Sequence, residues 1–142
     1  MSRDPSLPPE PLVLTEASAQ EIQLELIRRW KFNCFDGEKV VASLRRHRGL
    51  WRAALMDRLG VRSSDILPAM HLIKLRDLPK NEWNVDTLVV LTPDLESARV
   101  LAKISEDENW IADDARVIED ESERSSALGT SHPDYIVSFW WD

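Results

Sequence analysis

Residues 84–104 read NVDTLVVLTPDLESARVLAKI, and the period of their apolar side chains changes halfway along. Residues 88–91 form a run that is apolar on both faces, which is typical of a buried central strand. Residues 92–94 (Thr-Pro-Asp) combine a capping side chain, a first-turn proline and an acidic group, which is a helix start. Apolar side chains then recur at helical spacing over residues 95–104. This stretch therefore predicts a strand followed directly by a helix.

Two more strands are expected after this helix. Residues 115–119 (ARVIE) are apolar at their centre and charged at both flanks, which favours a strand near a sheet edge. Residues 135–141 (YIVSFWW) are mostly apolar on both faces, which favours a strand covered on both sides. Residues 121–134 are polar and without periodicity, so they predict a long loop. Before residue 84, the alternating segment 70–75 (MHLIKL) also predicts a strand.

The first part of the chain predicts helices. The first helix is expected to begin at Thr15 and to end near Lys31, and Asp36 is a good cap for a second helix. A further apolar face extends to Leu59. Gly49 interrupts this region, and an interior glycine costs a helix about 1 kcal/mol relative to alanine. We therefore expect a break or a kink there, with one continuous helix as the alternative.

This order of elements predicts an α+β fold. About three N-terminal helices would pack on a mixed sheet of about four strands with one crossover helix. The proline-rich residues 1–14 would form a flexible lead-in. A chain of 142 residues fits a single domain over residues 15–142. Its first part, residues 15–62, would be helical and basic, and residues 63–142 would be sheet-forming and acidic.

The charges divide unevenly along the chain. Residues 1–81 hold 14 basic and 10 acidic side chains, whereas residues 82–142 hold 4 and 15, for a net charge of −7. A split of this size shapes the electric field around the protein and attracts a partner of opposite charge.

Several classes of protein are not expected from this sequence. The sequence contains no run of 18 apolar residues, the length that a transmembrane helix needs. The single cysteine, Cys34, cannot make an intramolecular disulfide and fits a reducing cytoplasm. The four glycines do not form a phosphate-binding loop, and no histidine or cysteine pair has metal-ligand spacing. We therefore expect no cofactor, no metal site and no membrane span.

The acidic segment 106–123 is the candidate partner-binding surface. Trp110 lies in its midst, and an aromatic side chain with an acidic rim resembles an interaction hot spot. The alternative is that Trp110 closes the preceding helix onto the sheet. The side chains assigned to this surface are Asp107, Trp110, Asp113, Asp114, Glu119 and Asp120.

An arginine segment is the candidate anion-binding surface. If one helix continues through Gly49, then Arg45, Arg48 and Arg52 share a face at i, i+3 and i+7, close to Trp51. Arginines beside an aromatic ring suit phosphate or nucleic-acid recognition. The simpler interpretation is that these arginines are solvated or neutralise the acidic half of the molecule, because nucleic-acid-binding domains are usually basic overall.

A catalytic site has weaker support. Ser131, His132 and Asp134 supply the residue types of a hydrolytic triad, but a triad is recognised by geometry and not by adjacency. A histidine in such a loop caps a turn more often than it acts in catalysis. Cys34 lies between two phenylalanines, which favours a small buried side chain over a nucleophile.

The sequence therefore favours a non-enzymatic, cytoplasmic protein-binding module that engages a basic partner through an acidic surface. By analogy, it could be an inhibitor of the immunity or antitoxin type, or an adaptor. The first alternative is a nucleic-acid-binding accessory protein that uses residues 45–62. The second is a small enzyme that uses the loop around His132 and Asp134.

Overall fold

The computed structural model describes residues 12–57 and 73–142, and within them the chain is α+β. The α-helices are α1 (Ala19–Arg29), α2 (Gly37–Arg46), α3 (Ile73–Asp77), α4 (Leu95–Asp107) and α5 (Glu121–Leu128). The strands are β1 (Lys31–Phe32), β2 (Phe35–Asp36), β3 (Ala53–Asp57), β4 (Thr87–Thr92), β5 (Asp114–Ile118) and β6 (Tyr135–Trp140). Short 3₁₀ turns, η1 (Arg48–Leu50) and η3 (Leu78–Lys80), complete these elements.

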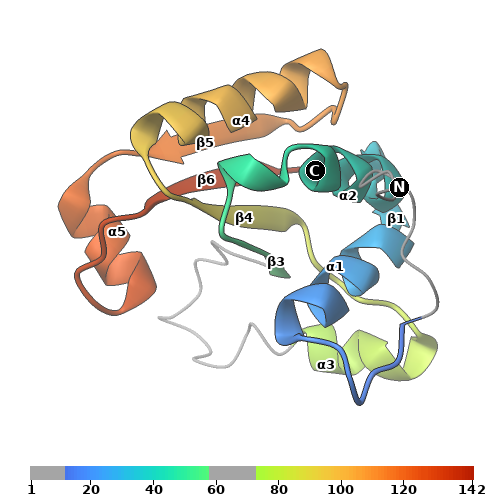
Figure 1. Cartoon of the computed structure of the whole chain (residues 1–142). Helices are drawn as coiled ribbons and strands as arrows, with labels where there is room; N and C mark the ends of the chain where they lie inside the picture. Colours follow the sequence, from blue (N-terminus) through green and yellow to red (C-terminus); the bar gives the residue numbers. More distant parts are fainter. Residues whose placement is uncertain (1–11, 58–72) are drawn as a thin grey trace.

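The main sheet has four strands in the order β3-β4-β6-β5, and β1 and β2 form a separate hairpin (Figure 1). Every neighbouring pair of the main sheet is antiparallel, so the sheet is antiparallel rather than mixed. Because β4 and β5 both pair with β6, they run parallel to each other. Helix α4 connects them and is the predicted crossover helix. The predicted strands at β4, β5 and β6 and the helix α4 are confirmed, and β5 lies at the sheet edge.

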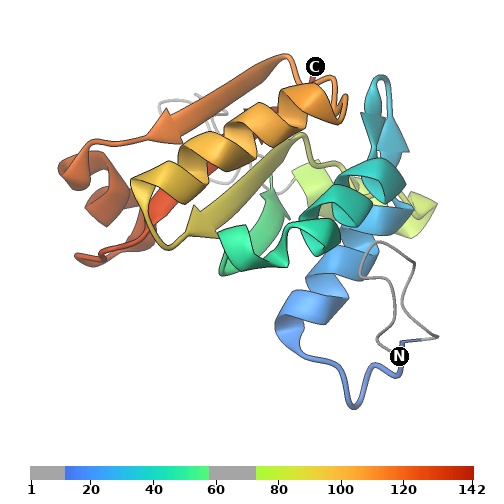
Figure 2. The same cartoon turned by 45° about the horizontal axis from the view of Figure 1, so that its top comes forward.

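The hydrophobic core lies between one face of the sheet and helices α1, α2 and α4. Figure 2 shows α4 lying across the sheet, with α1 and α2 beside it, while α5 sits at one end. The strands contribute side chains that are fully buried, among them Leu88, Val90, Val137 and Phe139, and the helices contribute Ile27, Leu44 and Leu101. None of the helices described combines the length and the apolar character needed to cross a bilayer.

Helix α1 begins three residues later than predicted. Ser18 and not Thr15 is its cap, because Ser18 Oγ accepts a hydrogen bond from the backbone N–H of Glu21 and the Glu21 side chain accepts one from Ser18. Such a capping box satisfies two backbone donors at once. Beyond α1 the chain makes the β1–β2 hairpin, which the sequence pattern did not indicate. Asp36 caps α2 as predicted.

The prediction of a third helix towards Leu59 is wrong. Helix α2 ends at Arg46, and residues 53–57 form β3, which pairs with β4. Its alternation places Ala54 and Met56 in the core and leaves Leu55 exposed. The same apolar residues fit a helical face and a strand, and the backbone partner in β4, thirty or more residues away, selects the strand.

Two further predictions need correction. The segment predicted as a strand over residues 70–75 enters helix α3 at Ile73, while residues 70–72 lie outside the described part. The predicted loop over residues 121–134 contains α5, capped by Asp120 and ended by Gly129 in the left-handed conformation. This helix is polar, so no apolar stripe marks it in the sequence. Most of the predicted lead-in, residues 1–11, also falls outside the described residues.

Candidate functional site

The acidic segment begins where α4 ends, and a helix-capping motif shapes it. Asn109 is in the left-handed conformation (φ 56°). The backbone N–H of Trp110 donates to the carbonyl of Ser105 at 2.9 Å, and that of Asn109 donates to Glu106 at 3.2 Å. These two bonds form a Schellman motif, which reverses the chain and sends the next side chain back onto the helix.

This reversal places Trp110 in the core and not on the surface. Its side chain is 1% exposed, and its ring centroid lies 4.9 Å from that of Phe139. Its carbonyl accepts a hydrogen bond from Nε1 of Trp141 at 2.8 Å. Trp110 therefore closes α4 onto the sheet, the alternative that the sequence left open, and presents no ring to a partner.

The next residue, Ile111, occupies the exposed position instead. It is 57% exposed, and its backbone is also left-handed, at φ 55°. A β-branched residue rarely adopts this conformation, which costs about 1–2 kcal/mol. Ile111 lines a hollow of about 390 Å³ together with Glu106, Asp113 and Asp114. We call this feature, between the end of α4 and the start of β5, the acidic hollow.

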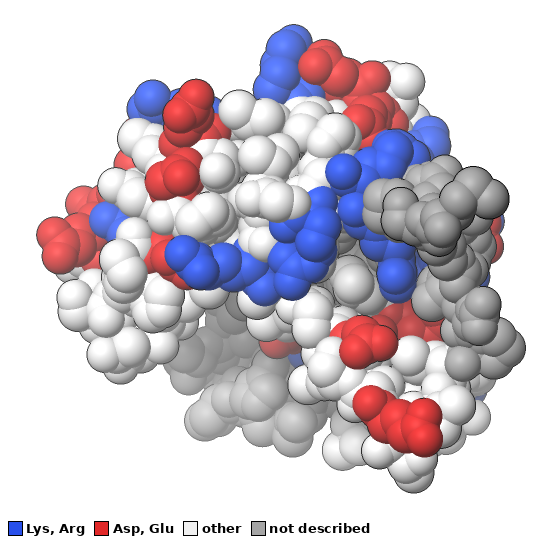
Figure 3. Space-filling model, in the orientation of Figure 1, with Lys and Arg blue, Asp and Glu red and all other residues white. Residues whose placement is uncertain are grey.

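The carboxylates of the acidic hollow are only partly engaged. Asp113 accepts a hydrogen bond from the backbone N–H of Asp142 at 2.7 Å, and Glu106 lies 3.8 Å from Lys103 in an exposed pair. The Asp114 side chain makes no hydrogen bond or ion pair with the residues described. Acidic side chains gather at this end of α4 in Figure 3.

The other predicted acidic residues do not join the hollow. Asp107 pairs with Lys103 at 3.3 Å on α4. Glu119 pairs with Arg99 at 2.8 Å, and Asp120 caps α5, so both lie beyond the far end of β5. The structure thus brings together Asp113 and Asp114 and leaves Glu119 and Asp120 apart from them.

Glu108, the C-cap of α4, fastens this region to α2. Its carboxylate lies 2.6 Å from Ser43 Oγ, 2.5 Å from Arg46 Nη2 and 2.7 Å from His47 Nε2. Burial alone would raise the pKa of Glu108, but hydrogen bonds from Ser43, Arg46 and His47 outweigh it and lower the pKa to about 2. The sequence offered no signal for this contact, because its partners lie more than sixty residues away.

The predicted arginine face does not form, because α2 ends before Gly49. Arg45 lies on α2, Arg48 in η1 and Arg52 just before β3. The Arg48 guanidinium stacks 3.9 Å from the Trp51 ring centroid and donates to the Trp51 carbonyl. Arg52 Nε lies 2.9 Å from Oδ2 of the buried Asp134. Basic side chains nevertheless gather across the middle of the face seen in Figure 3.

The candidate catalytic residues do not all converge: His132 and Asp134 are neighbours, and Cys34 lies elsewhere. The backbone N–H of Asp134 donates to His132 Nδ1 at 3.1 Å, so His132 caps a turn. The Asp134 carboxylate faces Arg52. The distance from His132 Nδ1 to Asp134 Oδ2 is longer, at 3.9 Å. Cys34 is exposed in the β1–β2 turn, which corrects the buried interpretation. Figures 1 and 2 both place this hairpin at the opposite end of the molecule from α5.

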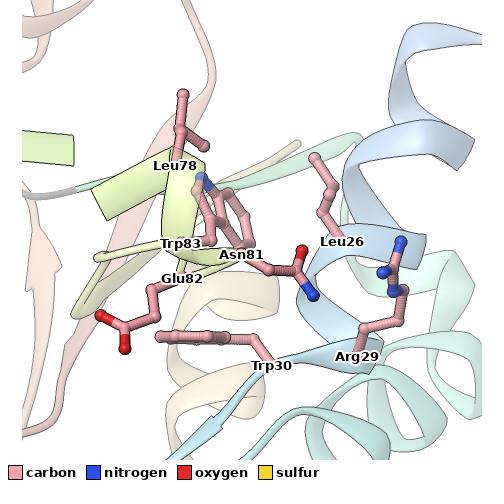
Figure 4. A pocket seen from close by; sticks show the side chains of 7 residues that line it. All are labelled: Leu26, Arg29, Trp30, Leu78, Asn81, Glu82 and Trp83. Carbon is pink, nitrogen blue, oxygen red and sulfur yellow. The ribbon is translucent and has the colours of Figure 1, made fainter. Parts of the chain in front are cut away.

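A second hollow, of about 340 Å³, lies between α1 and the loop that follows η3 (Figure 4). We call it the tryptophan hollow, because two indole rings form its walls. Its lining residues are Leu26, Arg29, Trp30, Leu78, Asn81, Glu82 and Trp83. Both tryptophans are among the six of the chain.

A third hollow, of about 410 Å³, lies on the sheet face opposite the core and has a mainly apolar lining that includes Leu55, Leu91 and Leu128. In the described part of the chain, no group of three or more His, Cys, Asp or Glu side chains could hold a metal ion. No family model, no curated protein and no solved structure matches the chain. The geometry of these surfaces is therefore the basis for assigning a function.

Proposed function

We propose that this protein is a non-enzymatic cytoplasmic binding module that engages a basic protein partner through the acidic hollow. The observation that carries this proposal is Ile111, an apolar side chain that is 57% exposed on a left-handed backbone. Unfavourable backbone geometry persists where the surrounding fold imposes it, and such residues cluster at binding sites. Here the Schellman turn and the buried Trp110 impose it.

The surroundings of Ile111 favour a cationic partner. Glu106, Asp113 and Asp114 place three carboxylates around one hollow, and their mutual repulsion weakens the free protein slightly. Basic side chains of a partner would relieve this repulsion and speed association, while Ile111 would supply apolar contact that slows dissociation. An inhibitor of the immunity or antitoxin type and an adaptor would both use such a surface.

A nucleic-acid-binding function through residues 45–62 is the rival proposal. The basic side chains that gather across the middle of the face in Figure 3 support it. Against it, Arg46 is paired with Glu108, Arg52 with Asp134, and Arg48 is stacked on Trp51. Each of these contacts would compete with a phosphate, so we place the acidic hollow first. The third proposal, a small enzyme that uses the loop around His132 and Asp134, has less support, because His132 Nδ1 accepts a hydrogen bond from the Asp134 backbone and the Asp134 carboxylate faces Arg52.

The proposal is tested by capture on immobilised protein from a lysate of the native host. Three baits are compared: the wild type, the variant Asp113→Asn/Asp114→Asn, and Glu96→Gln/Glu121→Gln. The last variant removes the same charge from two exposed positions outside the acidic hollow. We expect a basic protein on the wild type and the control, and its loss from the Asp113/Asp114 variant. Equal retention on all three baits, or retention of nucleic acid alone, would contradict the proposal.

A further inference from the structure

The tryptophan hollow has the walls of a binding site for a planar group. Trp30 follows the last residue of α1, and Trp83 lies in the loop between η3 and β4. Figure 4 shows the Trp30 ring edge-on along one side of the hollow and the Trp83 ring, turned more toward the viewer, on the other side. Leu26 and Leu78, which are 37% and 54% exposed, form the apolar rim. Flat aromatic faces with an apolar rim suit a planar ligand group.

Two opposite charges stand at the ends of this hollow, and each has a charged neighbour at longer range, Glu25 for Arg29 and Arg76 for Glu82. Figure 4 shows the Glu82 carboxylate at one end, beside the outer edge of the Trp30 ring, and the Arg29 guanidinium at the other. Neither side chain makes a hydrogen bond or an ion pair with another described residue, and none joins the two. Charged groups that line a hollow without a direct hydrogen bond or ion pair remain available to a ligand.

The loop that carries Trp83 is held in place before any ligand arrives. The carboxylate of Asp77, itself buried, accepts hydrogen bonds from Arg76 Nε at 2.8 Å and Asn84 Nδ2 at 3.1 Å. The bond from Arg76 is the main cause that lowers the pKa of Asp77 to about 2. The Asp77 carbonyl also accepts from the backbone N–H of Glu82 at 3.2 Å. A wall that is already ordered loses little conformational entropy on binding.

From these observations we infer that the tryptophan hollow binds an arginine side chain of a peptide that also carries a nearby carboxylate. A guanidinium is planar, stacks on an indole face and forms paired hydrogen bonds with a carboxylate. It therefore fits between the Trp30 ring and Glu82. The ligand's carboxylate fits the opposite end, where Arg29 and the Asn81 side chain offer donors. This site is separate from the acidic hollow and does not depend on the function proposed for it.

The probe is N-acetylarginine, which carries one guanidinium and one carboxylate. Its binding is followed by the indole N–H resonances of the full chain in two-dimensional NMR, with Trp30 and Trp83 assigned through Trp30→Phe and Trp83→Phe. We expect these two resonances to shift with a dissociation constant of about 1 mM, the range for a ligand of this size. N-acetylcitrulline, which lacks the positive charge, is expected to bind at least about tenfold more weakly.

Exposed charged positions provide the matched variants, since their substitution leaves folding almost unchanged. Glu82→Gln is expected to weaken N-acetylarginine about tenfold, while Glu96→Gln has no effect. Arg29→Gln is expected to weaken N-acetylarginine but not its amide, which has no carboxylate. Equal binding of N-acetylarginine and N-acetylcitrulline, no shift of the two indole resonances, or stronger binding of methyl glucoside at the same resonances would overturn the inference.

Discussion

At the scale of single residues, Ile111 links stability to the proposed function. Its left-handed backbone costs free energy that glycine would not lose. We expect Ile111→Gly to raise the free energy of unfolding by about 1 kcal/mol in urea denaturation. The same change removes the exposed side chain, so it should speed dissociation of the basic partner. A variant that is more stable and binds more weakly is the signature of a strained contact residue.

Asn109→Gly is the control for this prediction. Asn109 is also left-handed, but asparagine tolerates that conformation, so the gain in stability should be smaller. If Ile111→Gly destabilises the protein, the backbone at this position is not strained. If it leaves dissociation unchanged, Ile111 is not a contact residue.

The sequence identified the acidic side chains but not the apolar one beside them. Asp113 and Asp114 stand out because the local density of charge is visible in the sequence. The sequence does not show that Trp110 is buried and Ile111 is exposed, because this depends on which of the two adjacent residues the Schellman turn directs inward. That choice is set by backbone dihedral angles, which composition does not report.

At the scale of elements, the contact between α1 and α2 depends on Gly37. A Cβ atom at this position would lie 1.8 Å from the carbonyl oxygen of Ile27 and 2.6 Å from that of Trp30. Both are backbone atoms that cannot move alone, so Gly37→Ala should push the helices apart and cost about 1–3 kcal/mol or more. Thermal unfolding of this variant measures the loss.

Gly49→Ala is the matched control. Nothing lies within 4 Å of a Cβ at Gly49, and its backbone is not left-handed. We therefore expect no loss of stability, and a gain of up to about 1 kcal/mol from the reduced freedom of the unfolded chain. Equal unfolding temperatures for the two alanine variants would show that the tight approach of α1 to α2 is not real.

Glu108 makes the contact between α4 and α2 dependent on pH. Its pKa in the folded protein is about 2, below the ordinary value of 4.5, so its stabilising contribution is complete above about pH 4.5 and disappears as the pH falls towards 2. Glu108→Gln should lower the free energy of unfolding at neutral pH by about 1–3 kcal/mol and weaken its decline over that acidic interval.

Urea denaturation at neutral and acidic pH measures both effects of Glu108→Gln. Glu106→Gln, an exposed neighbour in a weak pair, is the control and should stay within about 0.5 kcal/mol of the wild type. A Glu108→Gln profile that follows the wild type across the acidic range would contradict the role given to this carboxylate.

Elements were predictable where the apolar period was unambiguous. The strand and helix of residues 84–104 follow from their local pattern and appear as β4 and α4. β3 was not predictable, because its five residues satisfy two periods and its partner strand decides between them. α5 was not predictable either, since a polar helix held by caps has no apolar stripe.

At the scale of the whole molecule, the uneven distribution of charge along the sequence produces both ion pairs between the two halves and an acidic surface. Arg46 and Arg52 of the first half neutralise carboxylates of the second half, those of Glu108 and Asp134. The carboxylates of the acidic hollow form no ion pair with these arginines. The long-range pairing follows from the fold and was foreseen only as a general alternative to anion binding.

The most direct test of the proposed function is the rate of association between this protein and its captured basic partner at rising ionic strength. The wild-type rate should fall steeply with salt, because exposed charges are screened over about 10 Å at 0.1 M. Asp113→Asn/Asp114→Asn should associate more slowly and show a weaker salt dependence, whereas Glu96→Gln/Glu121→Gln should follow the wild type. Identical salt dependence in all three proteins would contradict the assignment of the acidic hollow as the binding surface.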